Sequence, residues 1–351
     1  MKVPAIILSG WWVAPAAAVV TLMVGAVLVA PLFDQASGGA RGADFDLADT
    51  TVPRQYIVRA MNRDGVRALA TPAMIDATEV DRFNREERGK MLVPDDRVIG
   101  IEISGDARAY PLRLMRWHEV VNDVVGGESI AVTYCPLSDS VSVFSREVDG
   151  VEVELGVSGL LYNSTTLLYD SRSGPPDTPL WIQLDGRPIA GPAPDTKPRL
   201  ALRRTVLTTW GHWREGHPDT AVLAPLPDMK TLYKRDPYHS YFGSDILRFP
   251  VDPLPPEQGL SFKDRLVIIT IDGEDTAIAL QALAAAAGTR SGSLELTVQD
   301  LALRIGFDVD LGVATVEPLG EPNRLTAVRY AFWFAWYALE GTTPVMIPGA
   351  G

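Results

Sequence analysis

An uncharged segment near the N-terminus constrains this chain most. Residues 11–33 contain no charged side chain and consist almost entirely of Ala, Val, Leu, Met, Gly and Pro. As a helix, the segment is long enough to cross a hydrocarbon layer roughly 30 Å thick. Lys2 precedes it, whereas four aspartates follow within residues 34–49. Because positive charge is retained on the cytoplasmic side, we expect a short cytoplasmic tail (residues 1–10), a transmembrane anchor and an extracytoplasmic body.

A cleaved signal peptide is the alternative for this segment. The apolar region of a signal peptide is about 7–15 residues long. The uncharged segment is longer, and no small-x-small cleavage site follows it directly. The composition therefore favours an uncleaved signal anchor in the cell membrane. Residues 34–54, rich in Gly and Asp, have too little apolar content to fold and are predicted to form a flexible tether.

The rest of the chain can form a substantial folded body. With about 300 residues it can bury a large core without disulfides, and Cys135 is its single cysteine. The formal net charge is −12 and the basic residues are scattered along the sequence. Since nucleic-acid binding requires a concentrated positive surface, we expect no nucleic-acid partner.

The residue pattern predicts a β-rich α+β fold. Runs of Val, Ile, Thr and Tyr alternate with Gly, Pro, Asp and Asn. Strands are predicted at residues 98–103, 107–110, 129–135, 140–147, 151–157, 166–170 and 202–209. Residues 112–125 have apolar side chains at helical spacing and are predicted to form a helix that carries His118 on its inner face. Residues 327–339 are too short to cross a bilayer and are predicted to be a C-terminal packing helix.

A weak internal repeat divides the body. Residues 96–103 recur as residues 264–271, and Gly105, Ala109 and Leu112 align with Gly273, Ala277 and Leu280 at the same offset. The repeat predicts two strand-dominated lobes related by duplication, residues 55–245 and residues 246–351. The second copy contains neither Cys nor His, so it is predicted to be degenerate. Any chemical site is therefore expected in the first copy.

Cys135 is the main candidate for chemistry. It ends an apolar strand and is followed by Pro136, so it is expected at the mouth of the strand. A thiol there can be a nucleophile, a redox centre or a metal ligand if a histidine lowers its pKa. The alternative is a small apolar residue in the core, since free cysteine is among the most buried residue types.

His118 is the histidine nearest to Cys135 in the sequence, and it is the candidate base or co-ligand. Glu119 and Asn122 can orient its ring, whereas the alternative is a hydrogen-bonded core histidine. As metal ligands, Cys135 and His118 suit copper or zinc. His212 and His217 are five residues apart and miss the spacing that places two imidazoles on one helical face. A further alternative is that His212 or His217 completes a metal site at Cys135.

Several motifs resemble one family. Residues 134–138 (YCPLS), preceded by residues 117–123 (WHEVVND), resemble the domain-of-unknown-function family 3179. The likeness covers most of residues 90–340. It implies an exported or membrane-associated bacterial protein and assigns no reaction. Many relatives carry Cys-Pro-Leu-Cys, whereas Ser138 stands at the second position here, so a dithiol–disulfide cycle within this loop is excluded.

Two functions are compatible with these patterns. The first is a site for thiol-based catalysis or metal ligation at Cys135 and His118. The residues expected to line its pocket are Tyr134, Asn163, Ser164, Asp170, Trp181 and Gln183. The second is a non-catalytic module that binds a small molecule or a cell-envelope partner. The sequence leaves open whether the protein is an enzyme.

Overall fold

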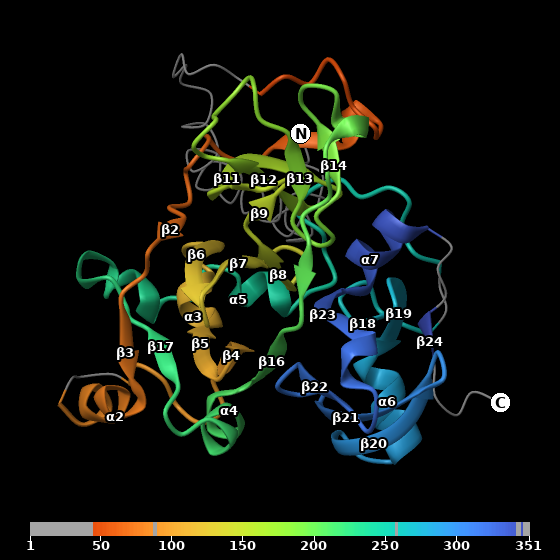
Figure 1. Ribbon diagram of the computed structural model, residues 1–351. Coiled ribbons are helices and arrows are strands. Elements are labelled where there is room, and N and C mark those ends of the chain that lie inside the picture. The colour runs from red at the N-terminus through yellow and green to blue at the C-terminus, as the bar shows by residue number, and fades with distance from the viewer. Residues whose placement is uncertain (1–44, 87–89, 257–258, 342–344, 347–351) are drawn as a thin grey trace, which may run out of the picture.

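A computed structural model describes residues 45–86, 90–256, 259–341 and 345–346 (Figure 1). The predicted tail, the predicted anchor and residues 34–44 of the predicted tether lie outside the described residues. Within the part of the chain that is described, no helix combines the length and apolarity needed to cross a membrane. Residues 45–54, assigned to the tether by the sequence, contact the body. Phe45 is buried with its ring 5.1 Å from that of Tyr169, and Thr51 N donates to Ile189 O.

The described residues form a β-rich fold, as predicted, with three larger sheets and one two-stranded ribbon. One sheet has nine strands, and β15 (Leu202–Arg203) pairs with β8 outside its main path. The other eight strands follow the order β2 (Leu69–Ala70), β6 (Val120–Val125), β7 (Glu128–Cys135), β8 (Ser140–Ser145), β23 (Leu325–Phe332), β18 (Arg265–Ile271), β19 (Glu274–Ala279) and β24 (Val345–Met346). We call this the central sheet.

The second sheet has eight strands in the described part of the chain, and the third has five. The eight follow the order β20 (Ser291–Val298), β21 (Leu301–Asp308), β22 (Val313–Pro318), β16 (Val206–Thr209), β4 (Arg97–Ile103), β5 (Asp106–Pro111), β17 (Ala221–Leu223) and β3 (Met74–Asp76). The five, at the top of Figure 1, are β1 (Ile57–Arg59), β11 (Leu155–Tyr162), β12 (Thr165–Asp170), β13 (Leu180–Ile182) and β14 (Pro188–Ala190). The ribbon joins β9 (Glu147–Val148) to β10 (Val151–Glu152).

Helices in the described chain are short. The α-helices are α2 (Ala77–Glu86), α3 (Leu112–Met115), α4 (Trp210–Gly216), α5 (His239–Phe242), α6 (Leu280–Ala287) and α7 (Trp333–Glu340). The 3-10 helices are η3 (Arg54–Tyr56), η4 (Pro194–Thr196), η5 (Pro227–Met229), η6 (Leu232–Lys234) and η7 (Pro322–Arg324). The C-terminal helix α7 packs into the body, since Trp333, Phe334 and Trp336 are buried.

Two predicted helix boundaries are wrong. The helix expected over residues 112–125 ends at Met115, and residues 120–125 form β6, which pairs antiparallel with β7. The β-branched valines of this segment suit a pleated strand once a partner strand is present. The helix expected from residue 327 begins at Trp333, because residues 325–332 form β23 between β18 and β8.

Each of the two larger sheets joins one block of strands from each half of the sequence. In the central sheet, β8 pairs with β23, and in the eight-stranded sheet, β22 pairs with β16. Each of the two segments expected as lobes therefore contributes strands to both larger sheets. Arg97 and Arg265 begin β4 and β18, and both donate hydrogen bonds to the buried carboxylate of Asp139.

The central sheet lies between the other two. Successive side chains of a strand point to opposite faces. On β7, Val132 and Tyr134 belong to the apolar cluster shared with the eight-stranded sheet, whereas Ala131 belongs to a cluster shared with the five-stranded sheet. Cys135 has the parity of Ala131, so it faces the five-stranded sheet. This alternation decides which elements surround the thiol.

Candidate functional site

Cys135 is buried at the end of β7, between the central and five-stranded sheets. It is fully inaccessible and packs in an apolar cluster with Leu161, Tyr241 and Phe332. Its Sγ donates a weak hydrogen bond to Ser164 O at 3.8 Å. The thiol thus lies beneath the turn between β11 and β12, and it is not exposed at a strand mouth as expected from the sequence.

Glu119 provides the carboxyl group that interacts with this thiol. It lies in the turn between α3 and β6 with a φ of 57°, in the left-handed region that a non-glycine residue seldom adopts. Its main-chain oxygen accepts a hydrogen bond from Tyr134 N at 2.8 Å. Its carboxylate accepts one from Thr166 Oγ1 at 2.9 Å. The strained turn therefore directs a carboxyl group into the space between the two sheets.

Burial controls the ionisation of both groups. It raises the pKa of Glu119 to about 7, although the hydrogen bond from Thr166 acts in the opposite direction. Burial also raises the pKa of Cys135, and the negative charge of Glu119 adds to this effect. Hydrogen bonds with Ser138 and Thr166 oppose it. The thiol is consequently protonated near neutral pH, whereas Glu119 is present in both protonation states.

His118 has other partners. Its Nδ1 lies 2.8 Å from Arg67 O, and its Nε2 lies 2.6 Å from the Tyr233 hydroxyl. Burial lowers the pKa of His118. Both ring nitrogens are thus engaged away from Cys135. Glu119, its neighbour in the sequence, is the ionisable group that interacts with the thiol.

A cavity of about 130 Å³ opens beside Glu119. Polar groups on its wall come from Glu119, Thr166, Tyr238 and Arg248. Its apolar wall is formed by Ala60, Met61, Leu137, Val157, Gly159, Leu160, Leu161 and Phe249. Burial raises the pKa of Tyr238, with further contributions from Glu119 and Cys135. The cavity therefore combines an apolar surface with a few polar groups, which is typical of a small-molecule site.

Residues 238–252, which we call the covering segment, close over Cys135. The Tyr241 hydroxyl donates to Leu137 O at 2.7 Å. Ser164 Oγ donates to Phe249 O at 3.1 Å, and Asn163 Oδ1 accepts from Asp252 N at 3.0 Å. Asn163 and Ser164, both expected in the pocket, thus hold the covering segment against the β11–β12 turn.

Lys263 fixes the same segment from its other end. Its ammonium group donates hydrogen bonds to the carbonyl oxygens of Tyr241, Ser244 and Ile246, and it lies 3.4 Å from the centre of the Tyr241 ring. Burial lowers the pKa of Lys263 to about 8. Three carbonyl acceptors satisfy the three protons of a charged ammonium group. Access to Cys135 therefore depends on these contacts.

The other residues expected in the pocket have different places. Tyr134 points to the opposite face of the central sheet, where its hydroxyl donates to Asp139 at 2.7 Å. Asp170 ends β12, and its carboxylate accepts a hydrogen bond from the Ser173 hydroxyl. Trp181 Nε1 donates to Pro198 O at 3.1 Å. Gln183 lies nearer the thiol, since it donates to the carbonyl oxygen of Ser140, the residue paired with Cys135.

Sequence reasoning missed the roles of Thr166, Tyr238 and Arg248. From the sequence, Glu119 is predicted only to orient His118. The one usable signal is its position directly before a strand that pairs with β7, but the sequence does not give the register of that pairing. Tyr238 and Arg248 come from a segment more than a hundred residues away along the chain, and no local pattern connects them to Cys135.

The geometry offers little support for metal binding. Among the described residues, no group of three or more His, Cys, Asp or Glu side chains is arranged to hold a metal ion. The copper or zinc site expected at Cys135 and His118 has no third protein ligand of these types in that part of the chain. The Glu119 cavity is the candidate site because it brings a buried carboxyl group near the single thiol.

Comparison with known proteins identifies the family. This β-rich chain belongs to the family described as "Protein of unknown function (DUF3179)", whose sequence model matches residues 63–343. The match includes the strands of the central sheet other than β24, and the residues around Cys135. No curated protein and no solved structure matches the chain significantly.

Proposed function

We propose that this protein binds a small organic molecule in the Glu119 cavity, and that Glu119 exchanges a proton with it or with Cys135. The observation that carries this proposal is a buried carboxyl group in the wall of a cavity, hydrogen-bonded to Thr166 and interacting with the single thiol. A carboxyl group with a pKa near 7 is suited to general acid–base catalysis at neutral pH.

Cys135 takes part in this proposed function only if it transfers its proton to Glu119. Transfer of its proton to the Glu119 carboxylate produces a thiolate and a neutral carboxyl group, so the cluster keeps its net charge. Arg248 also lines the cavity, and its positive charge favours a negatively charged group there. A ligand that displaces water from the cavity strengthens this attraction, because charges interact more strongly at low dielectric constant.

Thiol labelling of the native full chain tests the role of Cys135. We expect iodoacetamide to modify Cys135 slowly at pH 6 and faster at pH 8, and we expect Glu119→Gln to flatten this rise. Glu147→Gln, an exposed glutamate on β9, is the matched control. Modification that occurs only in unfolded protein would rule out a reactive thiol. A substrate screen then asks whether Glu119→Gln and Cys135→Ser lose a turnover that Glu147→Gln retains.

A non-catalytic binding module is the second candidate. The burial of Cys135 and the raised pKa of its thiol favour it, because a protonated, inaccessible thiol is a poor nucleophile. In that case a ligand found by screening should bind Cys135→Ser as well as the parent chain, with no turnover by either. Turnover that depends on Cys135 would count against it.

We also propose that residues 11–33 anchor the body to the membrane on its extracytoplasmic side. The length of the uncharged segment and the excess of acidic residues after it support this topology. Protease added to intact spheroplasts should remove the body, and alkaline carbonate should leave the chain in the membrane fraction. N-terminal sequencing that begins beyond residue 33 would instead establish a cleaved signal peptide.

We further propose that the two halves of the body are a duplicated unit. The element order β4-β5-α3-β6-β7-β8 recurs as β18-β19-α6-β20-β21-β22, and β16 and β23 each lead into a helix that begins with Trp. Superposition of the two units in an experimental structure should bring Arg97 onto Arg265. A poor fit of the paired strands would contradict a shared origin.

A further inference from the structure

Arg248 brings a positive charge to the wall of the Glu119 cavity. Among the described residues that line this cavity, it is the one cation. Its Cζ atom lies 5.0 Å from the centre of the Tyr241 ring and 5.6 Å from the centre of the Tyr238 ring. No described residue forms a hydrogen bond or an ion pair with its guanidinium group. The two rings therefore hold the guanidinium group in place and leave its N–H groups free for an acceptor.

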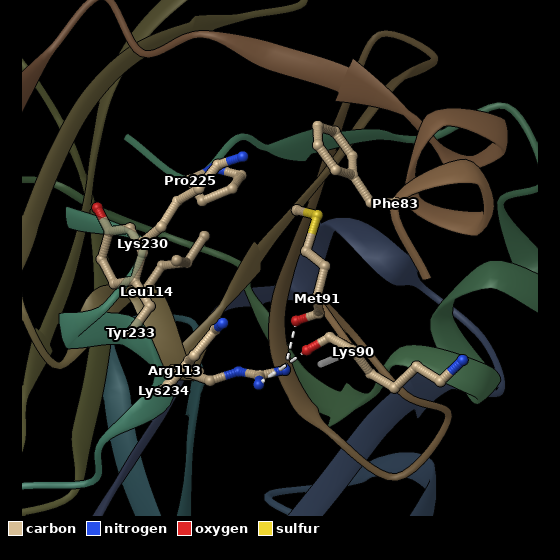
Figure 2. A pocket seen from close by; sticks show the side chains of 9 residues that line it. All are labelled: Phe83, Lys90, Met91, Arg113, Leu114, Pro225, Lys230, Tyr233 and Lys234. Atoms are coloured by element: carbon tan, nitrogen blue, oxygen red, sulfur yellow. Dashed lines mark hydrogen bonds between the residues drawn. The ribbon is translucent and has the colours of Figure 1, made fainter. Parts of the chain in front are cut away.

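The arginine of a second cavity is bonded differently. That cavity lies between α2, α3 and η6 and has a volume of about 80 Å³ (Figure 2). Arg113 lines it and donates hydrogen bonds to Lys90 O and Met91 O, as Figure 2 shows. It also donates to the Asp96 carboxylate at 3.0 Å. The lysines of the same cavity have partners as well. Of these two cavities, it is the Glu119 cavity whose wall has a cation without a polar partner in the described chain.

Tyr238 provides a second donor on the wall of the Glu119 cavity. Its main-chain N donates to Asp236 at 2.9 Å, whereas its hydroxyl has no hydrogen-bond partner among the described residues. Glu119 uses Oε2 for the bond from Thr166. A polar group on a cavity wall that lacks a protein partner is paired by water or by a ligand. A ligand that accepts hydrogen bonds from Arg248 and Tyr238 together would satisfy both.

The rest of the wall sets the size and the charge of such a ligand. Leu160, Leu161 and Phe249 are among the apolar residues of the wall. Since an apolar cavity of about 150 Å³ takes benzene, a volume of about 130 Å³ suits a body of about four to six carbon atoms. Glu119 lies in the same wall, so additional negative charge there is unfavourable. A carboxylate with a single charge therefore fits better than a phosphate, which carries nearly two.

We propose that the ligand of the Glu119 cavity is a small aliphatic carboxylic acid, whose carboxylate pairs with Arg248 and accepts a hydrogen bond from the Tyr238 hydroxyl. Its apolar body contacts Leu160 and Leu161. This assignment rests on the proposed function, and it adds the chemical class of the ligand and the residue that selects it. Two parallel N–H groups of a guanidinium match the two oxygens of a carboxylate. Because Arg248 is exposed, the ion pair is weak by itself, so affinity also requires the hydrogen bond and the apolar contacts.

Calorimetric titration of the full chain in a non-ionic detergent tests the assignment with two probes of the same shape. Isovalerate carries a carboxylate, and isovaleramide carries a neutral amide in its place. We expect isovalerate to bind the parent chain more tightly than isovaleramide. Arg248→Gln should weaken isovalerate binding about five- to tenfold and leave isovaleramide binding nearly unchanged. Tyr238→Phe, which keeps the ring beside Arg248, should weaken isovalerate binding about threefold. Arg304→Gln, an exposed arginine on β21 outside the cavity, should leave the binding of both probes unchanged.

The outcomes separate this assignment from the proposed function. Binding of isovaleramide by the parent chain as tightly as isovalerate would overturn the assignment, and so would an Arg248→Gln variant that keeps the preference for isovalerate. A loss in Arg304→Gln as large as in Arg248→Gln would also overturn it. In these three cases a small molecule still binds, so the proposed function stands. If neither probe binds the parent chain, the cavity does not accept a body of this size, and the proposed function fails together with the assignment. Thermal melts show whether each variant is folded, and exposed arginines are expected to tolerate glutamine.

Discussion

Thr166 donates a hydrogen bond of 2.9 Å from its Oγ1 to Oε2 of Glu119, and both side chains are buried. This bond links β12 of the five-stranded sheet to the turn that precedes β6 of the central sheet. Because the bond favours the charged carboxylate whereas burial disfavours it, the two effects together set the pKa of Glu119 near 7. The balance between them leads to the first two predictions.

Glu119→Gln should change how the stability of the protein depends on pH. The pKa of Glu119 is raised from 4.5 to about 7 in the folded protein. Its protonated form therefore favours the folded state below the unfolded pKa, and this contribution is lost as pH rises through about 7. Between pH 4.5 and pH 8, the free energy of unfolding of the variant should therefore rise, relative to that of the parent chain, by on the order of 3 kcal/mol. Urea unfolding at several pH values measures this difference, and a difference that does not vary with pH would contradict the raised pKa.

Thr166→Val should raise the pKa of Glu119 further. Valine has nearly the shape of threonine but cannot donate the hydrogen bond, and a hydrogen bond to a charged group is worth about 1.5–3 kcal/mol. We expect the pKa of Glu119 to rise by about one unit or more. An NMR titration of selectively labelled glutamate measures this shift. Thr297→Val, on an outer strand, is the control. An unchanged titration would show that Thr166 does not stabilise the carboxylate.

Lys263→Met should expose Cys135 to reagents. The substitution leaves the carbonyl groups of Tyr241, Ser244 and Ile246 without their common donor, so the covering segment should open more often. We expect iodoacetamide to label Cys135 several times faster than in the parent chain at equal stability. Val298→Ala, a buried substitution in the eight-stranded sheet, corrects for general destabilisation. If both variants label equally fast, local opening of the segment is not the cause.

Asp139→Asn should be among the most destabilising substitutions. Burial acts to raise the pKa of Asp139, but Arg97 and Arg265 hold it well below the usual range, so the carboxylate stays ionised at neutral pH. Removing its charge leaves two guanidinium groups in a largely buried site without their anion, which costs about 3–5 kcal/mol. Denaturant unfolding measures the loss. The exposed pair of Asp310 and Arg290 gives the comparison, since Asp310→Asn should cost far less because water screens the pair.

Much of the strand content could be predicted from the sequence. The segments expected at residues 98–103, 129–135 and 166–170 lie within β4, β7 and β12. Their β-branched and apolar residues favour strands in any pairing. The helix predicted over residues 112–125 is wrong beyond Met115, because the valines of this segment fit a helical period as well as a strand. The pairing of β6 with β7 decides between the two, and a local pattern cannot reveal it.

The sequence by itself determined that the chain has one thiol, that this thiol ends an apolar strand, and that the surrounding motifs belong to a known family. Only the tertiary structure decided that Glu119, and not the adjacent His118, is the ionisable group that acts on it. The physical reason is the turn at Glu119, which directs the two neighbouring side chains to different partners. Burial between two sheets then raises the pKa of the carboxyl group, and burial is a property of the packed layers that no single segment carries.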